Sequence, residues 1–186
     1  MHIILPRSTY WHSFWDMVLA FRAHPTPWDI HAITGLAANE TWDTYRQCTE
    51  ANQYGQNLPT GFVPSTVLWL IQDDTVVGIF QIRHRLTPAL EQRGGHIAYG
   101  IHPTFRGKGV CSAGLRLCLD YARDILGIET ALITCHSDNI PSHHVMRRAM
   151  HTWGGREDTS LCINDTWNIV FGSTPVHPYN PTLHIS

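Results

Sequence analysis

The sequence contains no long hydrophobic run and little charge of either sign. Charged residues make up 15% of the chain, and the 13 lysines and arginines against 15 acidic residues give a net charge of −2. No apolar run approaches the roughly 20 residues that a membrane span requires, and the first ten residues lack the pattern of a secretory signal. A near-neutral charge gives no general attraction to nucleic acid or anionic lipid. We therefore expect a soluble, cytoplasmic protein without a nucleic-acid or membrane partner.

Several ligand-binding motifs are also missing. The 5 cysteines have no CxxC spacing, and the 13 histidines are scattered without an HExxH or zinc-ligand pattern. We therefore expect free thiols and no metal. Neither GxGxxG nor GxxxxGK[ST] occurs, which argues against a dinucleotide-binding fold and a P-loop NTPase. What is present is 43% hydrophobic content over 186 residues, enough for the core of a single domain.

The order of helical and strand patterns predicts the fold class. Apolar residues at three- and four-residue steps predict helices over 9–22 and 39–52, and β-rich runs follow. The remaining expected elements are strands at 65–72, 75–85 and 95–101, a loop at 86–94, a helix at 110–126, a strand at 129–136, a helix begun by Asp138-Asn139 and ended by Gly154-Gly155, and a hairpin of 160–162 with 166–171. This order predicts an α/β (α+β) fold with a mixed, mostly antiparallel central sheet and flanking helices. We expect the core at 64–172, a helical acceptor-side segment at 1–63 and a Pro-rich tail at 173–186.

The most informative segment is the glycine-bearing turn Arg106-Gly107-Lys108-Gly109-Val110-Cys111 between a predicted strand and a predicted helix. Such a turn presents unpaired backbone N–H groups and the positive end of the helix dipole to one point. Glycine lets a ligand approach the amides closely. The turn therefore predicts an anion site whose natural ligand is a phosphate.

Arg106, Gly109 and Cys111 fill the first, fourth and sixth places of a Q/R-x-x-G-x-G/A signature, with cysteine where glycine or alanine is usual. The downstream segment 133–142 resembles an "ITCxxDNxxS" block, and segments 62–66, 82–86 and 93–97 resemble further blocks of the same bacterial subgroup. Together these segments resemble the GCN5-related N-acetyltransferase (GNAT) superfamily. The resemblance implies transfer of acetyl from acetyl-CoA to an amine, in a V-shaped opening between two strands.

The resemblance also implies which residues hold the cosubstrate. The expected contacts are Ile101, Arg106, Gly107, Lys108, Gly109, Val110, Cys111, Ser112, Asn139 and Ser142. The helix N-terminus should also lower the pKa of the Cys111 thiol. No acidic run is present to attract a polycation, so we expect a small-molecule or amino-acid-like amine acceptor. The alternative is a degenerate module that binds acyl-CoA without catalysis. Many relatives pair through edge strands, which implies a homodimer.

Three residues are the expected proton carriers. His96 lies on the strand that borders the acetyl group in the resembled fold, so it is the first choice for the general base, with a structural role as the alternative. His136, at the end of the next strand, is the second choice, and His84 could orient substrate. The usual tyrosine acid falls on Met146, which has no proton to give. Tyr99 and Tyr179 are the candidate donors, and protonation of the thiolate by solvent is the alternative.

Overall fold

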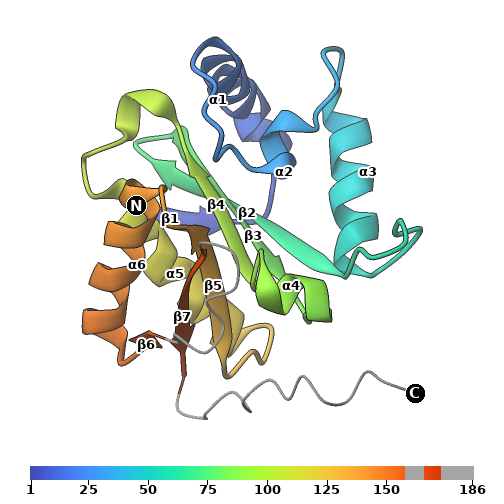
Figure 1. Ribbon diagram of the computed structural model, residues 1–186. Coiled ribbons are helices and arrows are strands. Elements are labelled where there is room, and N and C mark those ends of the chain that lie inside the picture. The colour runs from blue at the N-terminus through green and yellow to red at the C-terminus, as the bar shows by residue number, and fades with distance from the viewer. Residues whose placement is uncertain (158–165, 173–186) are drawn as a thin grey trace.

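Two antiparallel sheets lie side by side, with helices on their faces, in the computed structural model of the chain (Figure 1). The structure describes residues 1–157 and 166–172. The first sheet has the order β1-β2-β3-β4 and consists of β1 (His2–Ile4), β2 (Ser65–Gln72), β3 (Thr75–Arg83) and β4 (Ile97–Ile101). The second has the order β5-β7-β6 and consists of β5 (Ala131–His136), β7 (Thr166–Phe171) and β6 (Arg156–Glu157).

Helices cover both faces of the first sheet. The helices are α1 (Trp11–Ala23), α2 (His31–Thr34), α3 (Trp42–Gln53), α4 (Pro88–Gln92), α5 (Val110–Asp124) and α6 (Ile140–Trp153), and short 3₁₀ turns lie at Ser8–Tyr10 and Pro103–Phe105. α1 and α3 pack on one face through a cluster that includes Phe14, Trp69 and Ile79. α5 packs on the other face and joins the two sheets. The first sheet is therefore a buried middle layer.

Burial on both faces explains the apolar run in β2. Leu68 and Leu70 point toward α5, whereas Trp69 and Ile71 point toward α1 and α3, and all four side chains are fully buried. A strand with one face in water would alternate apolar and polar residues instead. Trp69 satisfies its indole N–H by donating to the Tyr45 hydroxyl at 3.2 Å.

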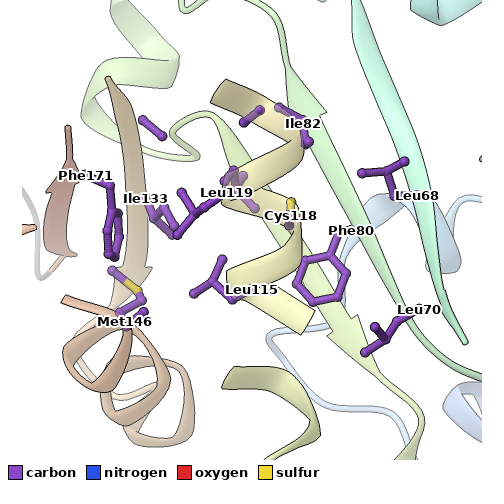
Figure 2. Close-up of a cluster of buried hydrophobic side chains, with 14 of the residues drawn as sticks. Leu68, Leu70, Phe80, Ile82, Leu115, Cys118, Leu119, Ile133, Met146 and Phe171 are labelled. Atoms are coloured by element: carbon purple, nitrogen blue, oxygen red, sulfur yellow. The ribbon is translucent and has the colours of Figure 1, made fainter. Parts of the chain in front are cut away.

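The cluster around α5 holds the two sheets together. Figure 2 shows Leu115 and Leu119 of α5 between Phe80 of the first sheet and Ile133 of the second. Met146 of α6 closes this cluster and is fully buried. Burial of apolar surface stabilises the folded state by about 25 cal/mol per Å². Because α5 shares one buried cluster with both sheets, it fixes how the two sheets sit relative to each other.

Most of the expected elements are confirmed. The hairpin of β2 and β3 turns at Asp73 and Asp74, which both have positive φ (47° and 58°), as a two-residue hairpin loop with a type I′ geometry requires. The loop expected at 86–94 is wrong in part, because Thr87 accepts a hydrogen bond from the Leu90 N–H and caps α4. β1, α2 and β6 were not predicted, since each has at most four residues. The strand expected at 160–162 and the Pro-rich tail lie outside the described residues.

Two further findings concern partners. Among the residues that the structure describes, no helix combines the length and the apolar character needed to cross a membrane. Within the same ranges, no three histidine, cysteine or acidic side chains are grouped to hold a metal ion.

The four cysteines in the described part of the chain are free thiols, namely Cys48, Cys111, Cys118 and Cys135.

Candidate active site

The segment immediately before β4 joins β5 at a short junction, where the Gly94 N–H also donates to the Thr134 hydroxyl at 2.8 Å. The His96 N–H donates to the Leu132 carbonyl at 2.6 Å, and the Leu132 N–H donates to His96 Nδ1 at 3.0 Å. Gly95 makes this approach possible: its φ is +60°, and a Cβ there would lie 2.5 Å from the Leu132 oxygen. Beyond this junction the two strands belong to separate sheets. The V-shaped opening that the resemblance implies is therefore present.

The register of β4 decides which backbone groups line this opening. Arg83 donates to the His96 carbonyl and His102 donates to the Val77 carbonyl, so the even-numbered residues of β4 bond to β3. In an antiparallel ladder the intervening residues turn their N–H and C=O groups to the other edge. The N–H groups of Tyr99 and Ile101 therefore face the opening, where they can bind an extended ligand chain.

The turn after β4 has the geometry of an anion site. Gly107 and Gly109 have φ of +74° and +77°, and a Cβ at either position would meet nothing within 4 Å. At the start of α5, hydrogen bonding of the backbone N–H groups begins at Ala113, which donates to the Gly109 carbonyl at 3.2 Å. In the described part of the chain, the N–H groups of residues 107–112 have no acceptor. The turn thus has both the room and the donors that a diphosphate needs.

The two cations of the turn lie in different surroundings. Arg106 lines the cavity, but its Nε donates to the Ile101 carbonyl at 3.1 Å and its Nη2 lies 3.6 Å from Asp29 Oδ1. Lys108 is exposed and does not line the cavity, and its Nζ lies 5.5 Å from the centroid of the Phe105 ring. Of the two cations, Arg106 therefore lies at the cavity and Lys108 outside it.

A cavity of about 920 Å³ runs from this turn into the opening between β4 and β5. Its volume suits a large elongated ligand together with a small one. Of the expected cosubstrate contacts, all except Lys108 line it: Ile101, Arg106, Gly107, Gly109, Val110, Cys111, Ser112, Asn139 and Ser142. Tyr99 and His136 also line it, whereas His96 does not.

The start of α6 forms the second wall. Asn139 is the N-cap, and its side-chain oxygen accepts from the Ser142 N–H at 3.2 Å. The Ser142 hydroxyl lies 2.7 Å from the Tyr99 hydroxyl and thereby joins α6 to β4 across the cavity. Burial raises the pKa of Tyr99 well above its usual range, so the phenol keeps its proton at neutral pH.

The expected lowering of the Cys111 pKa is wrong. Cys111 packs against the core cluster around α5, and burial raises the pKa of its thiol to about 12. Loss of hydration disfavours the thiolate more than the helix dipole favours it. Cys111 is therefore a neutral packing residue at this position.

The histidine candidates lie in different surroundings. Burial, with Arg83 nearby, lowers the pKa of His96 to about 4, and its Nδ1 is already bonded to Leu132. This geometry favours the structural role over the general-base role. His136 lines the cavity, with Nδ1 at 3.3 Å from the Asp138 backbone nitrogen and 3.7 Å from its Oδ2. His84 bonds to Thr66 and lies outside the cavity lining.

The linker between α1 and α2 (residues 24–30) lies in the segment that the sequence placed on the acceptor side, and it supplies cavity residues that were not named individually. Trp28 stacks on the His136 ring with centroids 4.9 Å apart and an interplanar angle of 27°. Asp29 is 6% exposed and receives hydrogen bonds from the Thr26 N–H and hydroxyl. The local signal was the Thr26-x-x-Asp29 spacing, which is typical of a turn. Nothing local indicates that this turn reaches β5.

Comparison with known proteins identifies the family. The acetyltransferase (GNAT) domain family matches residues 11–149. RimJ from Mycobacterium smegmatis in complex with CoA-disulfide is 16% identical, with a TM-score of 0.61 over 91% of this chain and 80% of that chain. The ribosomal-protein-S5-alanine acetyltransferase from Vibrio fischeri is 14% identical, with a TM-score of 0.59 over 91% and 90% of the two chains.

The microcin C7 self immunity acetyltransferase MccE, in complex with acetyl-CoA and AMP, is also similar. It is 14% identical, with a TM-score of 0.59 over 91% of this chain and 89% of that chain. At these identities the solved structures show a common fold, and comparison with the curated proteins finds no match. The family match covers about three quarters of the sequence. The chain belongs to the GNAT acetyltransferase family.

Proposed function

We propose that this chain transfers the acetyl group of acetyl-CoA directly to the amine of a small-molecule or amino-acid-like acceptor. The observation that carries the proposal is the continuity of one cavity from the unpaired N–H groups of the turn to the free edge of β4. Acetyl-CoA supplies an activated acetyl group there. The family membership and the nine lining residues among its ten expected contacts support this ligand.

The free backbone edge of β4 orients the reaction. The N–H groups of Tyr99 and Ile101 point into the opening, so one of them can polarise a thioester carbonyl as an oxyanion-hole donor does. Such a donor contributes about 3 kcal/mol of transition-state stabilisation. Direct attack by an amine then requires mainly positioning and proton transfer.

His136 is the best-placed proton acceptor. Its ring lines the cavity beside Asp138, whose Oδ2 lies 3.7 Å from Nδ1, so the imidazole is within reach of an amine bound there and can take its proton. His96 instead holds β4 against β5. We assign the general-base role to His136 and a structural role to His96.

Tyr99 is the proposed proton donor to the departing sulfur. The phenol is protonated at neutral pH, lines the cavity, and is held by Ser142 at 2.7 Å. Met146, at the usual place of the acid, is fully buried in the core cluster around α5, and its Sδ accepts a hydrogen bond from the Ser142 hydroxyl at 3.8 Å.

The acceptor end of the cavity supports a small acceptor without several positive charges. The Trp28–His136 stack lies in the cavity wall, and Arg83 and Arg93 also line the cavity. Within the described residues, Asp29 is the single acidic side chain of the lining, and Arg106 lies beside it. A polyamine or a lysine-rich tail would meet repulsion there.

The experiment has two arms. Calorimetry measures CoA affinity, and a thiol-release assay with acetyl-CoA measures turnover on amino acids, amino sugars, aminoacyl compounds, short peptides and polyamines. We expect CoA binding and an acetylated product from an acceptor outside the polyamine group. Turnover on polyamines alone would overturn the acceptor class. CoA binding without turnover on any amine would favour the acyl-CoA-binding module, which the apolar Met146 at the usual acid place also favours.

A further inference from the structure

The Arg106 guanidinium is held by three different parts of the fold. Nε donates to the Ile101 carbonyl of β4, Nη2 lies 3.6 Å from Asp29 of the α1–α2 linker, and Cζ lies 5.0 Å from the centroid of the Phe21 ring of α1. Because the guanidinium is a rigid planar fork, contacts in three directions fix its orientation. The side chain therefore connects the phosphate-binding turn to the N-terminal segment.

Asp29 depends on this arginine. Its carboxylate is 6% exposed and accepts two hydrogen bonds from Thr26, at 2.8 Å to Oδ2 and 2.7 Å to Oδ1. Those donors are neutral, and a buried carboxylate is costly unless a cation accompanies it. In the described part of the chain, Arg106 is the cation within ion-pair distance of Asp29. The conformation of the linker and the position of the Arg106 side chain therefore depend on each other.

The same linker reaches the opposite wall of the cavity. Trp28, the neighbour of Asp29, stacks on His136 at the end of β5 with centroids 4.9 Å apart. Trp28, Asp29, Arg106 and His136 all line the cavity. The linker therefore contacts both the turn and β5, through an ion pair at Asp29 and an aromatic stack at the adjacent Trp28.

We infer that Arg106 positions the acceptor wall. Through Asp29 it fixes the linker that holds Trp28 over the acceptor, and the backbone of residues 107–112 binds the diphosphate. This inference rests on the proposed function, because the acceptor is assumed to enter beneath the linker. It assigns to the first residue of the turn signature a role in acceptor binding and to Asp29 a role that its sequence position did not suggest.

The alternative is that the guanidinium binds phosphate directly. In that case Arg106→Met would weaken CoA binding more than tenfold, and Asp29→Asn would leave acceptor kinetics unchanged. If Arg106 positions the acceptor wall, both variants raise the acceptor KM about tenfold, while the CoA Kd stays within about threefold of the parent protein. The double variant should be no worse than either single variant, because both remove the same contact.

The test compares Arg106→Met, Asp29→Asn and the double variant with Glu50→Gln. Glu50 pairs with Arg46 on the exposed side of α3 at 2.7 Å, so this control removes an arginine–carboxylate pair remote from the cavity. Acceptor KM, kcat and CoA Kd are measured for each. An unchanged acceptor KM in Asp29→Asn, or a loss of CoA affinity confined to Arg106→Met, would overturn the inference.

A second measurement needs no acceptor and therefore separates this inference from the proposed function. Hydrogen–deuterium exchange of residues 24–30 is followed in the free chain. We expect exchange there to accelerate at least threefold in Asp29→Asn and Arg106→Met, with no change in the β2 and β3 segments. Equal protection of residues 24–30 in the parent protein and both variants would overturn the inference, whatever the acceptor proves to be.

Discussion

His96 and Leu132 exchange two hydrogen bonds, one of them through the imidazole ring, and so replace one rung of a sheet ladder at the point where β4 and β5 meet. The ring nitrogen accepts from the Leu132 N–H at 3.0 Å, and the His96 N–H donates to the Leu132 carbonyl at 2.6 Å. A proton on Nδ1 would turn this acceptor into a donor facing another donor. The junction that closes one end of the cleft therefore requires a neutral His96 ring.

This relationship predicts a pH dependence of stability. The pKa of His96 is about 4 in the folded chain, against 6.5 for an ordinary histidine, so the unfolded chain binds more protons between these values. The contribution of His96 to the free energy of unfolding is fully present above pH 6.5. It is lost as the pH falls to 4, and the loss is about 3 kcal/mol at most. His96→Asn keeps an acceptor for Leu132 without titrating. Urea unfolding at pH 7, 6 and 5 should show that the free energy of unfolding falls more steeply with pH in the parent protein than in His96→Asn. The same pH dependence in both proteins would contradict the prediction.

Gly95→Ala should destabilise the junction itself. The substitution combines a positive φ with a Cβ placed 2.5 Å from the Leu132 oxygen, so backbone strain and overpacking add to about 2–4 kcal/mol. Gly127→Ala is the matched control, because Gly127 has a φ of +67° and nothing within 4 Å of a Cβ. The control should lose only about 1 kcal/mol. Urea unfolding measures both, and equal losses would mean that the close approach is unimportant.

Gly109→Asp should remove CoA binding while the chain stays folded. A carboxylate at this position would project into the space in front of the unpaired N–H groups and repel the diphosphate. We expect the CoA Kd to rise at least about 100-fold, close to 3 kcal/mol. Gly127→Asp has a comparable φ and open surroundings, so it controls for backbone strain. Near-normal affinity in Gly109→Asp would remove this turn from the site.

Tyr99→Phe should slow the chemical step without weakening cosubstrate binding. The change removes one hydroxyl, which bonds to Ser142, and leaves the ring that packs on Phe80. Loss of a positioned proton donor lowers kcat by about 100-fold. Tyr121→Phe on α5, outside the cavity lining, is the control. An unchanged kcat in Tyr99→Phe would indicate that solvent protonates the sulfur.

His136→Gln tests the proposed base. Removing the proton acceptor should reduce kcat/KM by about 100-fold at neutral pH. The deficit should shrink at high pH, where the acceptor amine is already neutral. A rate profile from pH 6 to 10 in the thiol-release assay measures this. A deficit that is constant across pH would instead indicate that His136 acts by supporting Trp28.

Local sequence was sufficient for most of the longer elements and for the turn before α5. The β2–β3 hairpin follows from two β-rich runs around Asp73-Asp74, and the α6 start follows from Asn139 as an N-cap. The turn at Gly107 and Gly109 follows from the need for positive φ before a helix. Each of these features depends on residues within a few positions of one another, and propensity and capping act at that range.

Tertiary structure decided what the side chains do. The sequence shows Arg106 beside a phosphate turn, but only packing of α1 and its linker places Asp29 and Phe21 around the guanidinium. It shows a thiol at a helix N-terminus, but burial sets the Cys111 pKa. It shows His96 beside the strand that borders the opening, but the contact with Leu132, 36 residues away, occupies its ring. Backbone conformation is fixed by near neighbours along the chain, whereas charge state, hydrogen-bond partner and solvent access depend on segments that meet only when the chain folds.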